Sequence, residues 1–340
     1  MRTSIRSIAV SAAVALVCLT PGVVHADPAS SPDRCQEVTF PVAAGTVAGT
    51  LCLPPGGSTD TVMVLMAGSN YNHTYWDFPY APETYNFRRA MNAAGYATLV
   101  ADRLGNGASS RPPSLSLTAG TTANALHDIV QTLRHGIPGA QPFAKIVTGG
   151  HSLSSGTSLM EGIWYRDVDG ILLTGYSHAV NAAEALGVIS TYYPAIEDPL
   201  FAGRGLDPGY VVSRPGTRLH HFFVPDNVDP QVLTIDEETK ETFSLTEYPD
   251  GLAYTLPGMS SRVDVPVMVT NGSLDRLSCG IAYAICRDTA TLQAAEAPFF
   301  SPAARLRTYV LPDSGHSLNL ARNTADYQRA VIDWMKSISG

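Results

Sequence analysis

Apolar positions along the chain form short continuous runs, separated by longer segments in which they recur at helical spacing. The short runs are rich in β-branched residues and predict strands at residues 62–66, 97–101, 145–148, 170–174, 265–270 and 306–311. Elsewhere apolar side chains recur every three or four residues, as in 87–94, 126–133 and 327–338, which predicts amphipathic helices. Apolar strands that alternate with such helices predict an α/β fold: a mostly parallel central sheet with helices on both faces.

Two parts of the chain depart from this alternation. Strand patterns on either side of residues 43–45 predict an N-terminal hairpin that adds antiparallel edge strands to the sheet. Residues 179–262 are rich in proline, glycine and aromatic residues and are too long for a plain loop. We expect them to form an inserted cap, or lid, between the two parts of the core at residues 27–178 and 263–340.

Residues 1–26 have the layout of a secretory signal peptide. Arg2 and Arg6 precede an apolar run that ends near Leu19, and Ala26 is a small residue at the expected cleavage position. We therefore expect cleavage near Ala26 and a secreted, extracellular protein. The apolar run is shorter than the roughly 20 residues that span a bilayer. Since no later segment is long and apolar enough either, no integral membrane contact is expected.

The charge of the chain narrows the classes of partner. With 22 Lys and Arg against 30 Asp and Glu, the formal net charge is −8. Removal of residues 1–26, which contain two arginines and no acidic residue, changes it to −10. An acidic protein is a poor candidate for binding nucleic acid or an anionic membrane surface. We expect a small-molecule substrate, and the sequence leaves the oligomeric state open.

Four cysteines follow the predicted cleavage position: Cys35, Cys52, Cys279 and Cys286. An even number of cysteines in an exported chain favours disulfides, and three connectivities are possible. We favour the two local pairs, because the first two cysteines flank the predicted hairpin and the last two would close a loop. The absence of a CxxC pair with a histidine at ligand spacing argues against a metal site at these cysteines.

The strongest chemical signal lies in residues 149–156, Gly-Gly-His-Ser-Leu-Ser-Ser-Gly, between a predicted strand and a helical segment. A nucleophilic serine on a sharp strand-to-helix turn needs small residues two positions before and after it. Gly150 and Ser154 meet this need around Ser152, although glycine is usual at the second position. The turn also presents the backbone N–H of Leu153 to a developing oxyanion. The alternative is a glycine-rich loop with an incidental serine.

A serine nucleophile needs a base, and the base needs an orienting acid. Asp275 and His316 each follow one of the last two predicted strands, so both are expected at the same sheet edge as Ser152. The segments VTGGHSLSSG, VPVMVTNGSLDRL and LPDSGHSLN resemble the nucleophile, acid and histidine segments of the α/β-hydrolase superfamily. The resemblance extends over most of residues 35–340, and the order serine, aspartate, histidine is that of the superfamily's triad.

This resemblance implies the α/β-hydrolase fold and a serine esterase or lipase-like activity with Ser152, His316 and Asp275 as the triad. Residues 67–70 resemble the oxyanion loop of the superfamily, with Ala-Gly where His-Gly is frequent. By that alignment the backbone N–H of Ser69 is the second oxyanion donor, and Asn70 is the nearest alternative. No metal or organic cofactor is required by this chemistry.

Other readings of the same residues were weighed. The G-x-G in residues 102–109 does not fit dinucleotide binding, because Ser110 stands where a third glycine is needed. His151 is expected to pack beneath the serine turn, and the pair His220–His221 to lie at the surface or line a pocket. His73 and Trp76 are expected at the pocket entrance.

The aromatic content of the predicted cap favours an apolar pocket over the serine. We expect hydrolysis of a carboxylic ester or lactone of a fairly apolar small molecule through an acyl-enzyme. The alternatives are an amidase or peptidase on the same fold, and a non-catalytic binding module.

Overall fold

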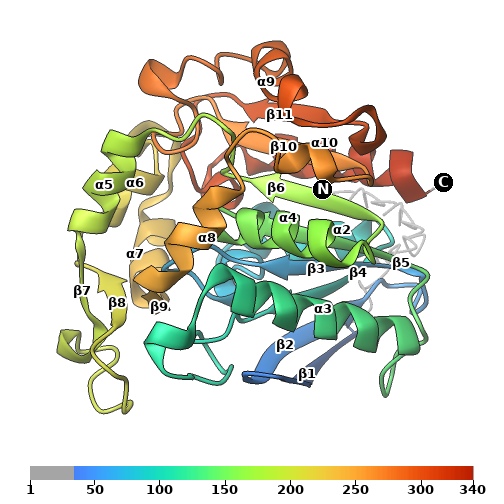
Figure 1. The fold of residues 1–340 in the computed structure, drawn as a ribbon, viewed down its shortest axis with the longest axis horizontal. Coiled ribbons are helices and arrows are strands. Elements are labelled where there is room, and N and C mark those ends of the chain that lie inside the picture. The colour runs from blue at the N-terminus through green and yellow to red at the C-terminus, as the bar shows by residue number, and fades with distance from the viewer. Residues whose placement is uncertain (1–33, 340) are drawn as a thin grey trace, which may run out of the picture. The chain divides into compact units, whose positions relative to one another are not determined.

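The computed structural model describes residues 34–339, so the predicted signal peptide lies outside the described residues. The main sheet has eight strands in the order β1-β2-β4-β3-β5-β6-β10-β11 (Figure 1). β1 and β2 pair antiparallel, β2 pairs antiparallel with β4, and the remaining neighbours are parallel. The prediction of a mostly parallel sheet with antiparallel N-terminal edge strands is therefore confirmed. The strands are β1 Arg34–Val42, β2 Gly45–Leu53, β3 Thr61–Met66, β4 Ala97–Ala101, β5 Lys145–His151, β6 Gly170–Thr174, β10 Val267–Gly272 and β11 Arg307–Leu311.

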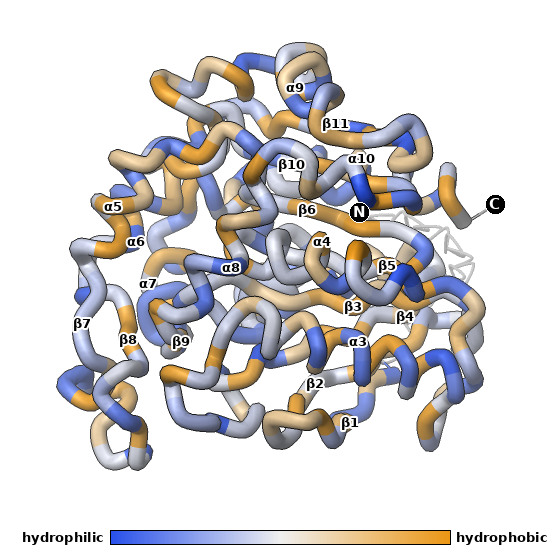
Figure 2. Tube along the Cα trace, viewed as in Figure 1, coloured by the Kyte–Doolittle hydropathy of each residue, from blue (hydrophilic) through white to orange (hydrophobic). Residues whose placement is uncertain are grey.

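Helices cover both faces of this sheet. One apolar cluster joins α3 and α4 to one face, and a second joins α2 and α10 to the other. Every residue of β3, β4 and β6 is buried, which explains why these strands are apolar throughout (Figure 2). The helices of the core are α1 Pro82–Tyr85, α2 Phe87–Ala93, α3 Ala119–His135, α4 Leu153–Tyr165, α9 Thr289–Glu296 and α10 Thr324–Ser339.

The chain between β6 and β10 forms the inserted cap. It contains a separate antiparallel sheet in the order β7-β8-β9. Some of its aromatic side chains, such as Phe201 and Phe243, are buried in packing, whereas Tyr192 and Tyr248 line a cavity. The elements are α5 Ala182–Ser190, β7 Tyr192–Pro194, β8 Tyr210–Ser213, α6 Arg218–Phe222, α7 Pro230–Glu238, β9 Phe243–Ser244 and α8 Tyr248–Ala253.

The end of β5 differs from the sequence prediction. The strand was expected over residues 145–148 and continues to His151, because residues 149–151 stay in register with 172–174 of β6. The glycines at 149 and 150 hide this continuation from an apolar-run criterion. The strand therefore delivers the chain to Ser152 without an intervening loop.

The cysteines pair as Cys35–Cys52 and Cys279–Cys286, which matches the two local pairs favoured from sequence. The first bond joins register partners of β1 and β2. The second closes a seven-residue separation in the loop after β10. Among residues 34–339, no helix is long and apolar enough to cross a membrane.

Candidate active site

Ser152 occupies a tight turn between β5 and α4. Its backbone has φ 53° and ψ −120°, a left-handed conformation that is strained for a non-glycine residue. The turn is held because the Ser152 N–H donates to the carbonyl of Thr174 at 2.8 Å and its carbonyl accepts from Ser155 N–H at 2.9 Å. The side chain is only partly buried and lines a cavity, so its hydroxyl is available to a ligand.

Small residues around the turn are required by close backbone contacts. A Cβ on Gly150 would lie 2.2 Å from the carbonyl oxygen of Ser154, and a Cβ on Gly68 would lie 2.8 Å from Cβ of Ser152. Ser154, where glycine is usual, has a structural role because its Oγ donates to the carbonyl of Ala67 at 2.5 Å. The departure from the usual pattern thus joins the serine turn to the loop after β3.

His316 and Asp275 lie next to each other, as expected from their positions after β11 and β10. His316 Nδ1 is 2.9 Å from Asp275 Oδ2, and both side chains are almost fully buried. The other carboxylate oxygen of Asp275 accepts backbone N–H groups from Leu277 at 2.8 Å and Ser278 at 3.1 Å. The carboxylate is therefore fixed in orientation, and the imidazole ring lines the same cavity as Ser152.

The loop after β3 approaches the serine turn and is held by the cap. Asn70 has a φ of 63°, and its Oδ1 accepts the N–H of Ser213 in β8 at 2.7 Å. The Asn70 carbonyl accepts from Arg218 Nη1 and from the N–H of Glu241, both at 3.2 Å. Cap residues thus fix the backbone next to Ser69. Ser69 and Leu153, the two expected oxyanion donors, both line the cavity.

The cavity beside Ser152 has a volume of about 760 Å³, open solvent at its mouth included. Its walls are mainly apolar and come largely from α5, α8 and the loop after β10. A short chain of hydroxyls interrupts this apolar surface: Ser69 Oγ lies 3.0 Å from Tyr248 OH, which lies 3.0 Å from Tyr192 OH. No motif marked these tyrosines, and the only sequence signal was the aromatic content of the cap. The apolar walls include Val188, Ile189, Leu252 and Leu277.

Two buried ion pairs support this region. Arg103 pairs with Glu247, each about 1% exposed, and Arg103 Nη2 also donates to the Gly68 carbonyl at 3.4 Å. Arg218 pairs with Asp236, with both side chains 2% exposed. Sequence reasoning missed both pairs, because their partners lie on separate elements or turns that only the folded chain brings together.

The other histidines fall into different environments. His151 is fully buried and stacks on Tyr75 with ring centroids 4.1 Å apart, as expected for packing beneath the turn, although it also contributes to the cavity wall. Burial and the neighbouring His316 hold the pKa of His151 well below its usual value, so the ring stays neutral. The expectation for His73 and Trp76 was wrong. His73 Nδ1 lies 2.9 Å from Asp102 Oδ1, and Trp76 is buried in the core, so neither lines the cavity.

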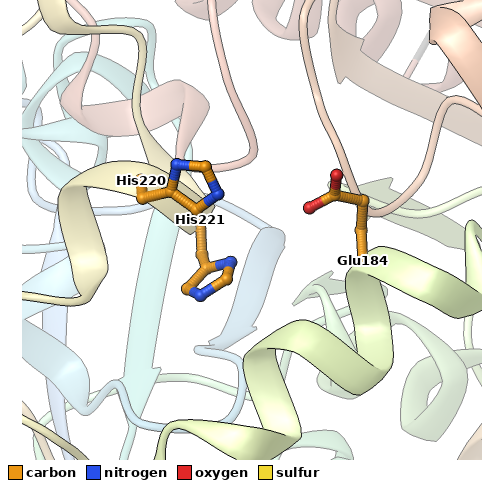
Figure 3. Close-up of side chains that lie close together, drawn as sticks. All are labelled: Glu184, His220 and His221. Atoms are coloured by element: carbon orange, nitrogen blue, oxygen red, sulfur yellow. The ribbon is translucent and has the colours of Figure 1, made fainter.

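His220 and His221 face Glu184 across the cap, between α6 and α5 (Figure 3). Their possible ligand atoms lie within 4.8 Å of one another. Glu184, however, already faces a cation, because Arg276 Nη1 is 3.7 Å from its carboxylate. His220 is exposed, and neither histidine belongs to the cavity wall. We therefore assign no role in the site to this group.

The chain matches the alpha/beta hydrolase family over residues 63–330 and belongs to that family. No curated protein matches the sequence. Among solved structures, an esterase from Thermogutta terrifontis is 19% identical, with a TM-score of 0.57 over 89% of this chain and 99% of that one. The enol-lactonase from Burkholderia xenovorans is 16% identical, with a TM-score of 0.58 over 88% and 100%. The esterase domain of a Rhodothermus marinus protein is 16% identical, with a TM-score of 0.54 over 90% and 99%. At these identities the similarity establishes the fold.

Proposed function

We propose that this protein is a secreted serine hydrolase that cleaves a carboxylic ester or lactone of a fairly apolar small molecule through an acyl-enzyme on Ser152. One observation carries the proposal: a serine in a strained turn lines the same cavity as a histidine that a buried carboxylate holds at 2.9 Å. That arrangement of nucleophile, base and orienting acid is the requirement for acyl transfer. The esterases and the lactonase that share the fold support the class of bond.

The proposed chemistry has two steps. His316 Nε2 removes the Ser152 proton as Oγ attacks the carbonyl carbon, and the same proton then passes to the leaving alcohol oxygen. Water repeats the sequence on the acyl-enzyme and releases the acid and free Ser152. Asp275 keeps the Nδ1 proton of His316 in place and stabilises the imidazolium. The N–H groups of Leu153 and Ser69 stabilise the oxyanion in each step.

The cavity supports a lipophilic substrate. Its aliphatic walls favour an apolar acyl or ring group, whereas the hydroxyls of Tyr248 and Tyr192 offer one polar contact beside Ser69. In the proposal, residues 179–262 are the cap over the serine, and 27–178 with 263–340 are the core. Two disulfides support an oxidising, extracellular destination.

The first test is hydrolysis of p-nitrophenyl esters of increasing chain length and of aromatic and aliphatic lactones by the wild type and Ser152→Ala. We expect turnover by the wild type and a loss of roughly a thousandfold or more in kcat for the variant, with its unfolding temperature unchanged. Ser116→Ala, an exposed serine on another segment, is the control and should retain full activity.

Labelling with a fluorophosphonate separates the alternatives. A hydrolase should be labelled at Ser152, and prior acylation by a poor ester should block the label. Turnover of peptide or anilide substrates in preference to all esters would replace the ester with an amide as the natural bond. A wild type that is neither labelled nor active on any substrate would contradict the proposal and indicate a binding module.

A further inference from the structure

Glu161 is a fully buried carboxylate on α4, away from the candidate active site. Neither of its oxygens has a hydrogen-bond partner among the described residues. An isolated buried carboxylate is strongly unfavourable unless a proton or a cation neutralises it. It lies nine residues beyond Ser152, about 13 Å along the helix at 1.5 Å per residue, so the proposed reaction does not use it.

Two more ligand groups face Glu161. Asp167, just beyond the end of α4, has a buried Oδ1 that also lacks a partner. Its Oδ2 accepts from Gln131 Nε2 at 2.6 Å and lies 2.7 Å from His127 Nδ1, both on α3. The possible ligand atoms of His127, Glu161 and Asp167 all lie within 4.8 Å of one another. An ion at their centre would need only a small contraction to reach ordinary coordination distances of about 2.0–2.2 Å.

The protein's own cations near this cluster are engaged elsewhere. Arg166, adjacent to Asp167 in the chain, faces Asp264 at 3.5 Å, and Arg134 pairs with Asp169. Glu161 also lies in the last turn of α4, where the helix dipole adds negative potential. Burial and the nearby Asp167 raise the pKa of Glu161 well above its usual value. A single shared proton would satisfy two of the three unpartnered oxygens and leave the third buried, whereas a cation can contact all three.

We propose that His127, Glu161 and Asp167 bind a divalent transition-metal ion that joins α3 to α4. One imidazole nitrogen with two carboxylates suits Zn²⁺ or Mn²⁺ better than Ca²⁺ or Mg²⁺, which prefer oxygen ligands alone. The side chains of His127 and Asp167 are 25% and 16% exposed, which gives the ion a path from solvent. The ion is structural: it stabilises the helix whose first residue is Leu153.

The test measures Zn²⁺ binding by calorimetry and the unfolding temperature after chelator treatment, with Ca²⁺ as the comparison ion. Glu161→Gln is the key variant, because glutamine has the shape of a protonated glutamic acid but is a poor metal ligand. His127→Gln removes the imidazole and serves as a second variant. His220→Ala/His221→Ala is the matched control, since it removes the other histidine–carboxylate group and keeps this one.

We expect Zn²⁺ to raise the unfolding temperature of the wild type and of the His220/His221 control by several degrees, and Ca²⁺ to do so much less. Glu161→Gln and His127→Gln should each weaken Zn²⁺ binding more than the roughly 10–100-fold that follows loss of an outer-shell partner. The proposal is overturned if Zn²⁺ leaves the wild type unchanged and Glu161→Gln is as stable, which indicates a shared proton. It is also overturned if only the His220/His221 control loses binding.

Discussion

Gly68 is the residue at which the loop after β3 comes closest to the proposed nucleophile. A Cβ at this position would lie 2.8 Å from Cβ of Ser152 and 2.9 Å from the carbonyl oxygen of His151. Both neighbours belong to the strained serine turn and have no room to move. A side chain here would therefore push the loop, and the N–H of Ser69 with it, away from the oxyanion position.

We expect Gly68→Ala to lower kcat on p-nitrophenyl esters by roughly 10²–10³-fold, the usual effect of losing one oxyanion donor. Gly56→Ala is the control, because nothing lies within 4 Å of a Cβ at residue 56. Steady-state kinetics of both variants provide the measurement. Equal kinetics for Gly68→Ala and the wild type would remove Ser69 from the proposed oxyanion hole.

Ser154 offers a test of stability at the same turn. Its hydroxyl is buried and donates to the Ala67 carbonyl, so Ser154→Ala leaves a buried acceptor with one partner fewer. We expect a loss of about 1–2 kcal/mol in the free energy of unfolding, measured in urea. Ser116→Ala removes a similar hydroxyl-to-carbonyl bond at an exposed site and should change stability by less than about 0.5 kcal/mol. Similar values for the two variants would argue against this role of Ser154.

At the scale of elements, the pair Arg103–Glu247 connects the loop after β4 to the start of α8. Replacing one partner leaves the other charge buried and uncompensated, which usually costs about 3–5 kcal/mol. We expect Glu247→Gln to be destabilised by that amount in urea unfolding and Arg103→Met/Glu247→Leu to recover most of it. Asp326→Asn breaks an exposed pair with Arg329 and should cost about 1 kcal/mol or less. A double variant as unstable as the single one would mean that the charges themselves are needed.

The central elements were predictable because their sequences carry their environment. β3 and β6 are buried on both faces and are therefore apolar runs, whereas α10 has one buried stripe at helical spacing. The positions of Ser152, Asp275 and His316 followed from the sheet edge that parallel strands share. The small elements of the cap were not predictable, because segments such as β9, two residues long, take their form from tertiary contacts.

The contacts missed from sequence share one cause. Ser69 and Tyr248 are 179 residues apart in the chain, and nothing near either residue indicates the other. His73 was misplaced for the same reason, since its partner Asp102 lies in the loop after a different strand. Local patterns identify residues that a strand or turn presents, but pairings between distant loops depend on the complete fold.

For the whole molecule, the two disulfides should differ in their effect on function. Cys35–Cys52 joins edge strands remote from the cavity, whereas Cys279–Cys286 closes the loop that follows Asp275. We expect Cys35→Ser/Cys52→Ser and Cys279→Ser/Cys286→Ser each to lose about 2–3 kcal/mol of unfolding free energy. Only the second pair should also lower kcat at a temperature where both variants are folded. Full activity of the second variant would mean that backbone N–H groups alone suffice to hold Asp275.

The attachment of Asn70 to the cap limits how this molecule can diversify. Ser213 and Arg218 belong to the segment expected to select the substrate, yet they also hold the backbone beside Ser69. Exchange of this segment for that of another hydrolase would change the pocket and release the oxyanion loop in the same step. Substrate range and catalytic power are therefore inherited together, and evolution towards a new substrate has to proceed through the pocket-facing side chains of α5 and α8 while the residues that grip Asn70 are retained.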